Sequence, residues 1–224
     1  MTPARLAIVV PTLDEEDNLR RHLPHALAMA DEVVVSDGGS RDATVRVAEE
    51  LGARVVTGPP GRGGQLHRGA LATTSEILLF LHADTQLPDG AADLVRRAIA
   101  DGAEGGAFFV RFTEERPWVL RIGERLVNLR TRLTKLPLGD QAQFLRRGVY
   151  EELEGFESWP ILEDLDMARR LRRRQRLALL WPPVRTSARR YLGRGILRTL
   201  VGNWLIWLLY AIGVSPHRLA GLYR

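Results

Sequence analysis

The sequence predicts an α/β fold in which helices flank a mostly parallel sheet, with an additional apolar helix at the C-terminus. Two observations support this prediction. Short apolar runs rich in β-branched residues alternate with helical patterns, and each run is followed by a polar segment. Such alternation is typical of βαβ units in an open parallel sheet, where ligands bind beyond the carboxyl ends of the strands.

Four apolar runs are expected to be strands buried on both faces, namely residues 6–10, 32–36, 54–57 and 77–81. Helices are expected between them. The first has leucines at a spacing of four and contains a proline that should kink it; the next ends at a glycine; a later one has a proline in its first turn. The residues concerned are Leu19, Leu23, Pro24 and Leu27; Val47, Ala48, Leu51 and Gly52; and Pro88, Leu94, Val95, Ala98 and Ile99.

The second half is less regular. Strands are predicted at 105–112 and 143–147, and helices at 118–133 and 161–174. The absence of repeats and of Gly/Ser linkers favours one catalytic domain over residues 1–194, followed by an apolar helical tail over 195–224.

The composition limits the possible functions. The chain has 224 residues and no cysteine, which excludes disulfides, zinc–thiolate sites and thiol nucleophiles. The net charge of +5 rests almost entirely on arginine and suggests anionic partners. The N-terminus lacks a signal-peptide pattern, so a cytoplasmic protein is expected. The basic run 169–176 has no interleaved aromatic residues; we expect it to be a solvated helix face, with no nucleic acid as partner.

The polar segments after the first four strands should meet at one edge of the sheet. The first turn has neither the G-x-G-x-x-G of dinucleotide binding nor a P-loop, nor the basic glycine-rich loop of nucleotidyltransferases. Asp37 fits either simple turn chemistry or hydrogen bonding to a nucleoside. Asp84 is either a solvated acid or a ligand of Mg²⁺ or Mn²⁺ bound to a diphosphate. Arg62, in a glycine-rich loop, is either a surface arginine or a diphosphate contact.

A cluster of acids begins the helix predicted at 161–174. Glu163, Asp164 and Asp166 stand in its first turn, where negative charge complements the helix dipole. The alternative is that one of them is a general base directed into the cleft.

In order, the segments "VVPTLDEEDNL", "VVVSDGGSRDAT", "LHADT", "GDQAQFLRR" and "ILEDLDMARRLRR" resemble glycosyltransferase family 2, over about residues 6 to 180. The resemblance implies the Rossmann-like GT-A fold. The small size and the "HADT" and "GDQAQF" variants look most like a compact bacterial subgroup, the arsenosugar-biosynthesis-type glycosyltransferases.

The resemblance implies an inverting transfer of one sugar from a nucleotide-diphosphate sugar, with UDP favoured, to a small-molecule or lipid-linked acceptor. Asp164 matches the catalytic base, and Asp84 matches the last acid of the D-x-D motif that holds Mg²⁺ or Mn²⁺. His82 stands where many members have the first aspartate, so metal binding would rest on Asp84 and the diphosphate oxygens. The alternatives are a nucleotidyltransferase and a non-catalytic, membrane-associated sugar-nucleotide-binding module. The implied substrate-binding residues are Pro11, Thr12, Glu15, Asp37, Arg62, Gln65, Asp140, Gln141 and Glu163.

The run 199–214 is uncharged, with Trp204, Trp207 and Tyr210 at a spacing of three. It is short for a membrane span. Two alternatives remain beside spanning. The segment 195–214 packs on the catalytic domain or on a second subunit, as in a homo-oligomer, or it lies in a membrane interface at the inner face. In the second case, basic residues would face anionic lipid; they are Arg189, Arg190, Arg194 and Arg198.

Overall fold

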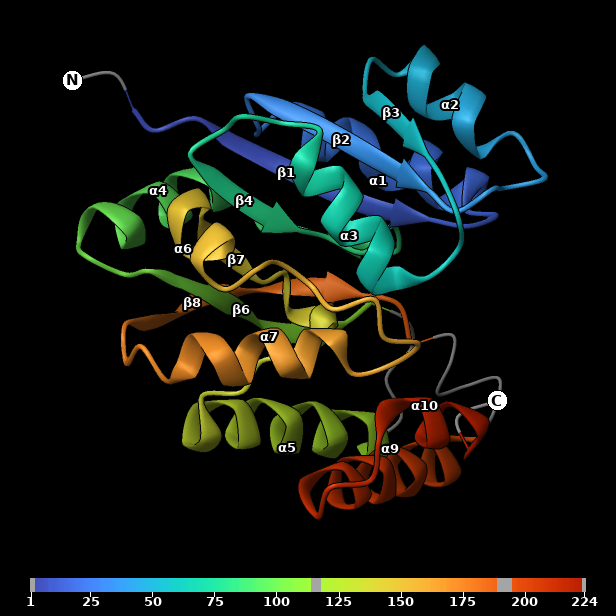
Figure 1. The fold of residues 1–224 in the computed structure, drawn as a ribbon, viewed down its shortest axis with the longest axis vertical. Helices are drawn as coiled ribbons and strands as arrows, with labels where there is room; N and C mark the ends of the chain where they lie inside the picture. Colours follow the sequence, from blue (N-terminus) through green and yellow to red (C-terminus); the bar gives the residue numbers. More distant parts are fainter. Residues whose placement is uncertain (1–2, 114–117, 189–194, 223–224) are drawn as a thin grey trace.

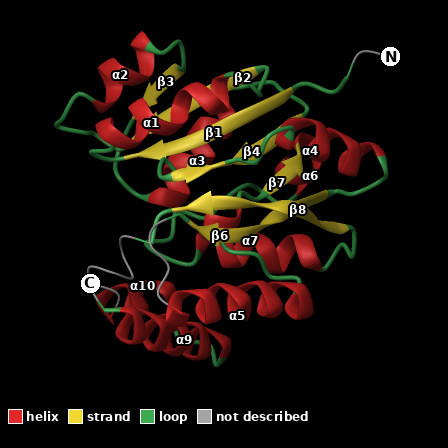
Figure 2. Ribbon diagram, turned by 180° about the vertical axis from the view of Figure 1, so that it is seen from behind, coloured by secondary structure: helices red, strands yellow, loops and turns green. Residues whose placement is uncertain are grey.

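The side chains of the first strand, β1 (Leu6–Thr12), alternate between two apolar layers, which is why helices cover both faces of the sheet. Leu6, Ile8 and Val10 belong to one core cluster, while Ala7 and Val9 belong to another. The computed structural model describes residues 3–113, 118–188 and 195–222. Figures 1 and 2 show the resulting three layers, with the sheet between helices.

The eight-stranded sheet has the order β3-β2-β1-β4-β7-β6-β8-β5. Its first four strands are parallel; beyond β4 the pairing is mixed, because β7 runs antiparallel to both of its neighbours and β5 runs antiparallel to β8. The sheet is therefore more mixed than predicted. The remaining strands are β2 (Glu32–Asp37), β3 (Arg54–Thr57), β4 (Ile77–Phe80), β5 (Thr85–Gln86), β6 (Gly105–Phe112), β7 (Phe144–Arg146) and β8 (Leu177–Thr186).

Helices α1, α2 and α4 contribute to the first cluster, and α3, α6 and α7 to the second. Helices α5 and α9 contact each other at the end of the molecule opposite β3 and α2 (Figures 1 and 2). The helices are α1 (Glu16–Leu27), α2 (Thr44–Glu50), α3 (Arg62–Leu71), α4 (Ala91–Ala100), α5 (Trp118–Thr134), α6 (Arg147–Glu152), α7 (Glu163–Arg172), α9 (Ile196–Ala211) and α10 (Pro216–Leu219), with 3-10 turns at Gly139–Gln141 and Ala220–Leu222.

The predicted strands and long helices are present, and α1 continues past Pro24 to Leu27. Three local predictions are wrong. Strand β3 is half-exposed because it lies at the sheet edge. Helix α4 begins at Ala91, after a left-handed Gly90, so Pro88 precedes it. Arg62 begins α3 and is not in a loop: Gly63 allows the first turn of this helix to approach the Glu157 carbonyl group too closely for any side chain.

The basic run 169–176 is also more involved in packing than expected. Arg170 pairs with Asp166 and donates to the Gly155 carbonyl group, and Arg174 pairs with Glu152. These arginines join α7 to α6 and its following loop, so the run is not simply a solvated face.

Helix α9 packs on α7 through one side. Trp207 and Tyr210 lie against Leu165 and Ala168, and the Arg169 guanidinium group lies 4.9 Å from the centre of the Tyr210 ring. Within the described residues, no helix combines the length and apolar character needed to cross a membrane. Arg189, Arg190 and Arg194 lie outside the described residues, as do the side chains of Arg198 and Trp204.

Candidate active site

Asp37, at the end of β2, is held by a complete set of hydrogen-bond donors. Its carboxylate accepts the backbone N–H groups of Gly39 (2.7 Å) and Ser40 (2.9 Å), together with the Ser40 hydroxyl group and that of Thr12 (3.1 Å). Burial alone would raise the pKa of Asp37, but these hydrogen bonds outweigh burial and lower it. The carboxylate is therefore ionised and fixed at the sheet edge.

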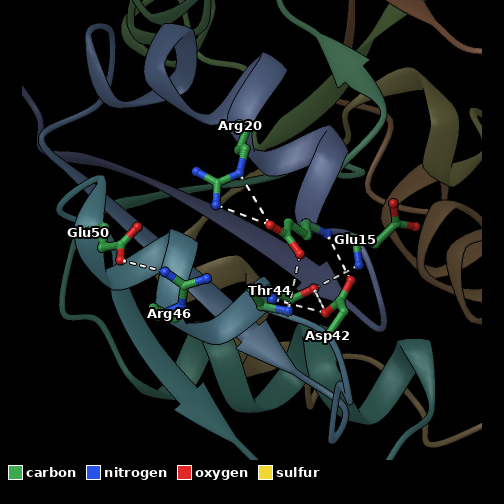
Figure 3. Close-up of polar contacts among 8 residues, drawn as sticks. Glu15, Arg20, Asp42, Thr44, Arg46 and Glu50 are labelled. Carbon is green, nitrogen blue, oxygen red and sulfur yellow. Dashed lines mark hydrogen bonds and ion pairs between the residues drawn. The ribbon is translucent and has the colours of Figure 1, made fainter.

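The loop after β1 is tied to the loop after β2 by backbone–side-chain hydrogen bonds. The Glu15 N–H group donates to the Thr44 hydroxyl group (2.8 Å), and the Glu16 N–H group donates to Asp42 (3.2 Å). In the opposite direction, the Arg41 N–H group donates to Asp14 (2.7 Å). Figure 3 shows Glu15 beside Asp42 and Thr44. The segment with Pro11, Thr12 and Glu15 is thus positioned next to Asp37.

Gln65, on α3, forms hydrogen bonds with the backbone at this edge of the sheet. Its side-chain amide donates to the carbonyl groups of Thr12 (2.7 Å) and Ser36 (2.9 Å), and its carbonyl oxygen accepts the Gly61 N–H group (3.1 Å). Gln65 is one of the predicted substrate-binding residues. In this buried position its amide is hydrogen-bonded to the backbone at the ends of β1 and β2.

A second cluster forms where β4 ends. His82 and Asp84 follow this strand, Asp140 lies in the turn Gly139–Gln141, and Asp164 begins α7. The carboxylate of Asp164 accepts the Gly139 N–H group at 2.7 Å. A methyl group at position 139 would lie 2.9 Å from both Asp164 Oδ2 and His82 Nε2, so glycine is required for these groups to meet there.

Asp140 lies in the field of both neighbouring acids. Burial, together with the charges of Asp164 and Asp84, raises its pKa to about 6 against the lowering effect of Arg130 and Arg62. Its Oδ1 atom is buried and has no hydrogen-bond partner within the described residues. Three separate segments of the chain therefore bring Asp84 and Asp164 close enough to Asp140 for their charges to act on it.

Arg62 extends from the start of α3 to the acids that begin α7. It forms an ion pair with Glu163 and lies 3.6 Å from Asp164. The Glu163 side chain is completely buried, burial raises its pKa, and its Oε2 atom has no partner among the described residues. Glu163, which is predicted to bind substrate, thus positions the Arg62 guanidinium group through a buried ion pair.

His82 is neutral at physiological pH. Burial and the adjacent positive charge of Arg62 together lower its pKa to about 4, against the opposing effect of Asp164. A neutral imidazole presents one N–H group and one lone pair, so it can donate to an oxygen or accept a proton or metal. It cannot supply the negative charge of the aspartate it replaces.

Gln141 is buried and braces the turn that carries Asp140. Its carbonyl oxygen accepts from the Thr131 hydroxyl group (2.9 Å) and the Leu138 N–H group (3.1 Å), and its amide donates to the Phe108 carbonyl group (3.1 Å). These contacts leave its amide directed at the protein. Gln141 therefore positions this turn, which glutamine suits because it both donates and accepts; its predicted contact with substrate stays a prediction.

A cavity of about 430 Å³ adjoins the site along α3. Gly61, Gly64, His67, Arg68 and Trp159 are among the residues that line it. Arg68 also donates to the Asp37 carbonyl group at 3.0 Å, so this cavity borders the Asp37 network. The three acids Asp84, Asp140 and Asp164 are not among the residues that line it.

Comparison with known proteins gives a consistent result. The family model described as glycosyl transferase family 2 matches residues 7–153. An uncharacterized glycosyltransferase of Mycobacterium bovis is 33% identical over 153 residues, which cover 61% of this chain and 64% of that protein. The match thus spans less than two thirds of that relative's length.

Two solved structures share the fold. S. aureus TarS (residues 1–349), in complex with UDP-GlcNAc, superposes with a TM-score of 0.65 at 16% identity, covering 83% of this chain and 59% of TarS. A mannosyltransferase from Pyrobaculum calidifontis, in complex with GDP-Man and Mn²⁺, also gives a TM-score of 0.65, at 19% identity, covering 100% of this chain and 70% of that one.

Proposed function

This chain belongs to glycosyl transferase family 2, and we propose that it transfers a single sugar, with inversion, from a nucleotide-diphosphate sugar to an acceptor hydroxyl group. The observation that carries the proposal is the convergence of Asp84, Asp140 and Asp164 beside the end of β4. β1 separates this strand from β2, which ends at Asp37. A nucleoside held at Asp37 would extend its diphosphate along this edge toward the acids.

The donor end of the site is built for neutral, polar groups. Asp37 is ionised, and two of its four donors are the Thr12 and Ser40 hydroxyl groups, which can rotate to release a carboxylate lone pair to a base or ribose without a change of protonation. We propose UDP as the nucleotide. The two structural neighbours are complexed with UDP-GlcNAc and with GDP-Man, so the fold itself accommodates more than one base.

The acids beside β4 fit a divalent cation. Asp140 Oδ1 is a buried oxygen without a partner among the described residues, and Asp84 lies close enough to raise its pKa. Within the described residues, no three His, Asp or Glu side chains form a ready metal cage. Mg²⁺ or Mn²⁺ on Asp84 and Asp140 would therefore complete its shell with water and diphosphate oxygens, which both ions accept. When bound, such an ion neutralises charge on the leaving diphosphate.

Asp164 is the proposed general base. The Gly139 and Leu165 N–H groups, both at 2.7 Å, fix its two oxygens in place. The acceptor oxygen attacks the anomeric carbon from the face opposite the diphosphate and its proton passes to Asp164, while the bond to the diphosphate oxygen breaks. Arg62, beside Asp164, stabilises negative charge on the diphosphate, and neutral His82 donates its N–H group there.

The test is to incubate the purified protein with a panel of nucleotide sugars, with Mn²⁺ or with EDTA, and to identify the products. Release of nucleoside diphosphate, with a product of inverted anomeric configuration by NMR, is the expected result. Release of pyrophosphate would indicate a nucleotidyltransferase instead. Donor binding by calorimetry with no turnover, toward water or any acceptor tried, would indicate a non-catalytic binding module.

A further inference from the structure

Helix α5 carries an exposed apolar stripe. Trp118, Ile122, Leu126, Leu129 and Leu133 follow one another at spacings of three or four, which places them on one side of the helix, and between 44% and 74% of each residue is exposed. Exposed single leucines are common in soluble proteins, but a continuous row of five large apolar side chains is not.

Helix α9 carries a second stripe. Val201, Leu205, Leu208 and Ile212 recur at the same helical spacing and are 50–71% exposed. Because α5 and α9 contact each other and form the same end of the molecule (Figures 1 and 2), the stripes belong to one end. We call these nine residues the α5/α9 surface.

Both helices pack on the protein through their other sides. The exposed stripes are therefore not the sides that pack on the hydrophobic core. On α5, the Asn128 side chain bonds the backbone N–H and C=O groups of Val110 in β6, and Leu120 is buried. On α9, Ile206 is buried, while Trp207 and Tyr210 pack toward α7. Each helix thus has an inner side that is already satisfied.

A row of arginines runs beside the apolar stripe of α5. Arg121, Arg125 and Arg132 are exposed and, at 100° per residue, fall on the side of the helix next to the stripe. The acid of this helix, Glu124, turns inward and accepts the Phe112 N–H group at 3.2 Å. The outer side of α5 therefore combines apolar bulk with net positive charge.

We propose that the α5/α9 surface docks on an anionic lipid membrane and holds the protein there peripherally. Apolar side chains beside a basic row are what an amphipathic helix needs to lie in a headgroup region. A second copy of the chain fits less well, because a two-fold contact that packs the two α5 helices antiparallel would place both arginine rows on the same side. The sequence predicts a membrane contact in 195–214 alone; the proposed surface also includes α5.

Docking would also set the position of the candidate active site relative to the membrane. The chain leaving α5 reaches Gly139 after the four residues 135–138, and Gly139 holds Asp164. The acids would then lie near the membrane surface, where an amphiphilic acceptor is concentrated. Docking itself does not depend on the proposed reaction, since it rests on residues outside the site.

The experiment is co-sedimentation of the full chain with vesicles of phosphatidylcholine and with vesicles of equimolar phosphatidylcholine and phosphatidylglycerol. Wild type should pellet with the anionic vesicles. Leu129→Glu/Leu133→Glu should stay in the supernatant, whereas the matched control Leu71→Glu, at an equally exposed leucine on α3 (69%), should pellet like wild type. Circular dichroism melting checks that all three are folded.

The arginines give an independent measurement. Arg121→Gln/Arg125→Gln/Arg132→Gln should weaken partitioning by about fivefold per arginine, and added salt should weaken wild type more than this variant. Wild type that stays soluble with anionic vesicles, or a Leu71→Glu variant that loses as much as the stripe variant, overturns the proposal. So does a wild-type dimer, seen by light scattering, that binds no vesicles and becomes monomeric on Leu129→Glu/Leu133→Glu.

Discussion

Two groups of carboxylates lie at one edge of the sheet, and they differ in how many of their oxygens have hydrogen-bond partners. Asp37 forms the satisfied region, and Asp140 and Glu163 form the unsatisfied region. Asp37 receives four hydrogen bonds and has a lowered pKa. Asp140 and Glu163 each retain a buried oxygen without a partner among the described residues, and burial raises the pKa of both. The satisfied region is fully hydrogen-bonded in the absence of a ligand. The unsatisfied region has a surplus of buried negative charge that a cation would relieve, at the cost of stability while it is empty.

The largest expected effect comes from removing the proposed base, Asp164. Asp164→Asn should lower kcat by roughly 10²–10⁴-fold, with little change in donor affinity, because the proton acceptor is lost and the shape is kept. The matched control is Asp166→Asn, in the same helix turn but paired with Arg170 at 2.7 Å. If acids in this turn served the helix dipole alone, the two variants would have similar kcat.

Breaking the satisfied region should affect donor binding instead. Hydrogen bonds to charged groups contribute about 1.5–3 kcal/mol, so Asp37→Asn should weaken donor affinity roughly tenfold to a hundredfold by calorimetry. Asp31 is the control: it accepts the Leu6 N–H group (2.7 Å) and pairs with Arg96 (2.8 Å), at the opposite end of β1. Asp31→Asn should lower Tm and leave donor affinity intact. Equal loss of affinity in both variants would mean that Asp37 acts through stability.

The protein should be more stable when the Asp140 charge in the unsatisfied region is removed. Because its folded-state pKa is raised from 3.8 to about 6, Asp140 contributes most to stability below pH 3.8, and this contribution is lost as the pH rises through about 6. Asp140→Asn is therefore expected to raise the Tm of the metal-free protein by a few degrees above that pH and to have less advantage below it.

His82 has the opposite dependence: with its pKa lowered to about 4, its contribution is lost as the pH falls from 6.5 toward 4. It is present in both proteins, so the difference between them isolates Asp140. Mn²⁺ should raise the Tm of wild type more than that of Asp140→Asn. A variant less stable than wild type at neutral pH, with an equal response to Mn²⁺, would contradict the assignment.

The smallest effect is expected at an exposed pair near the Asp37 region. Arg46 and Glu50 form an i,i+4 ion pair on α2 at 3.1 Å (Figure 3), with both side chains more than half exposed. Glu50→Ala should change Tm by about one degree or less and leave donor affinity unchanged, since water screens such pairs. A clear loss of donor affinity would show that α2 transmits strain to Asp37.

Much of the fold could be predicted because hydrophobic periodicity is a local property of the chain. The buried strands β1, β2 and β4 and the helices α5 and α7 follow from it. Helix α3 does not, since its glycines are a signal for a loop and become compatible with a helix where Gly63 meets the Glu157 carbonyl group. The direction of β7 and the exposure of β3 also depend on neighbours supplied by distant parts of the chain.

The sequence by itself determined which acids follow which strands, because residue order and strand polarity are enough to place Asp37 and Asp84 at one edge of a sheet. Tertiary structure decided their states. The pairing of Arg62 with Glu163 across 101 residues, the unpartnered oxygen of Asp140 and the outward side of α5 depend on what packs against each group. Burial and hydrogen bonding are set by those neighbours, and no local pattern records which distant residues they are.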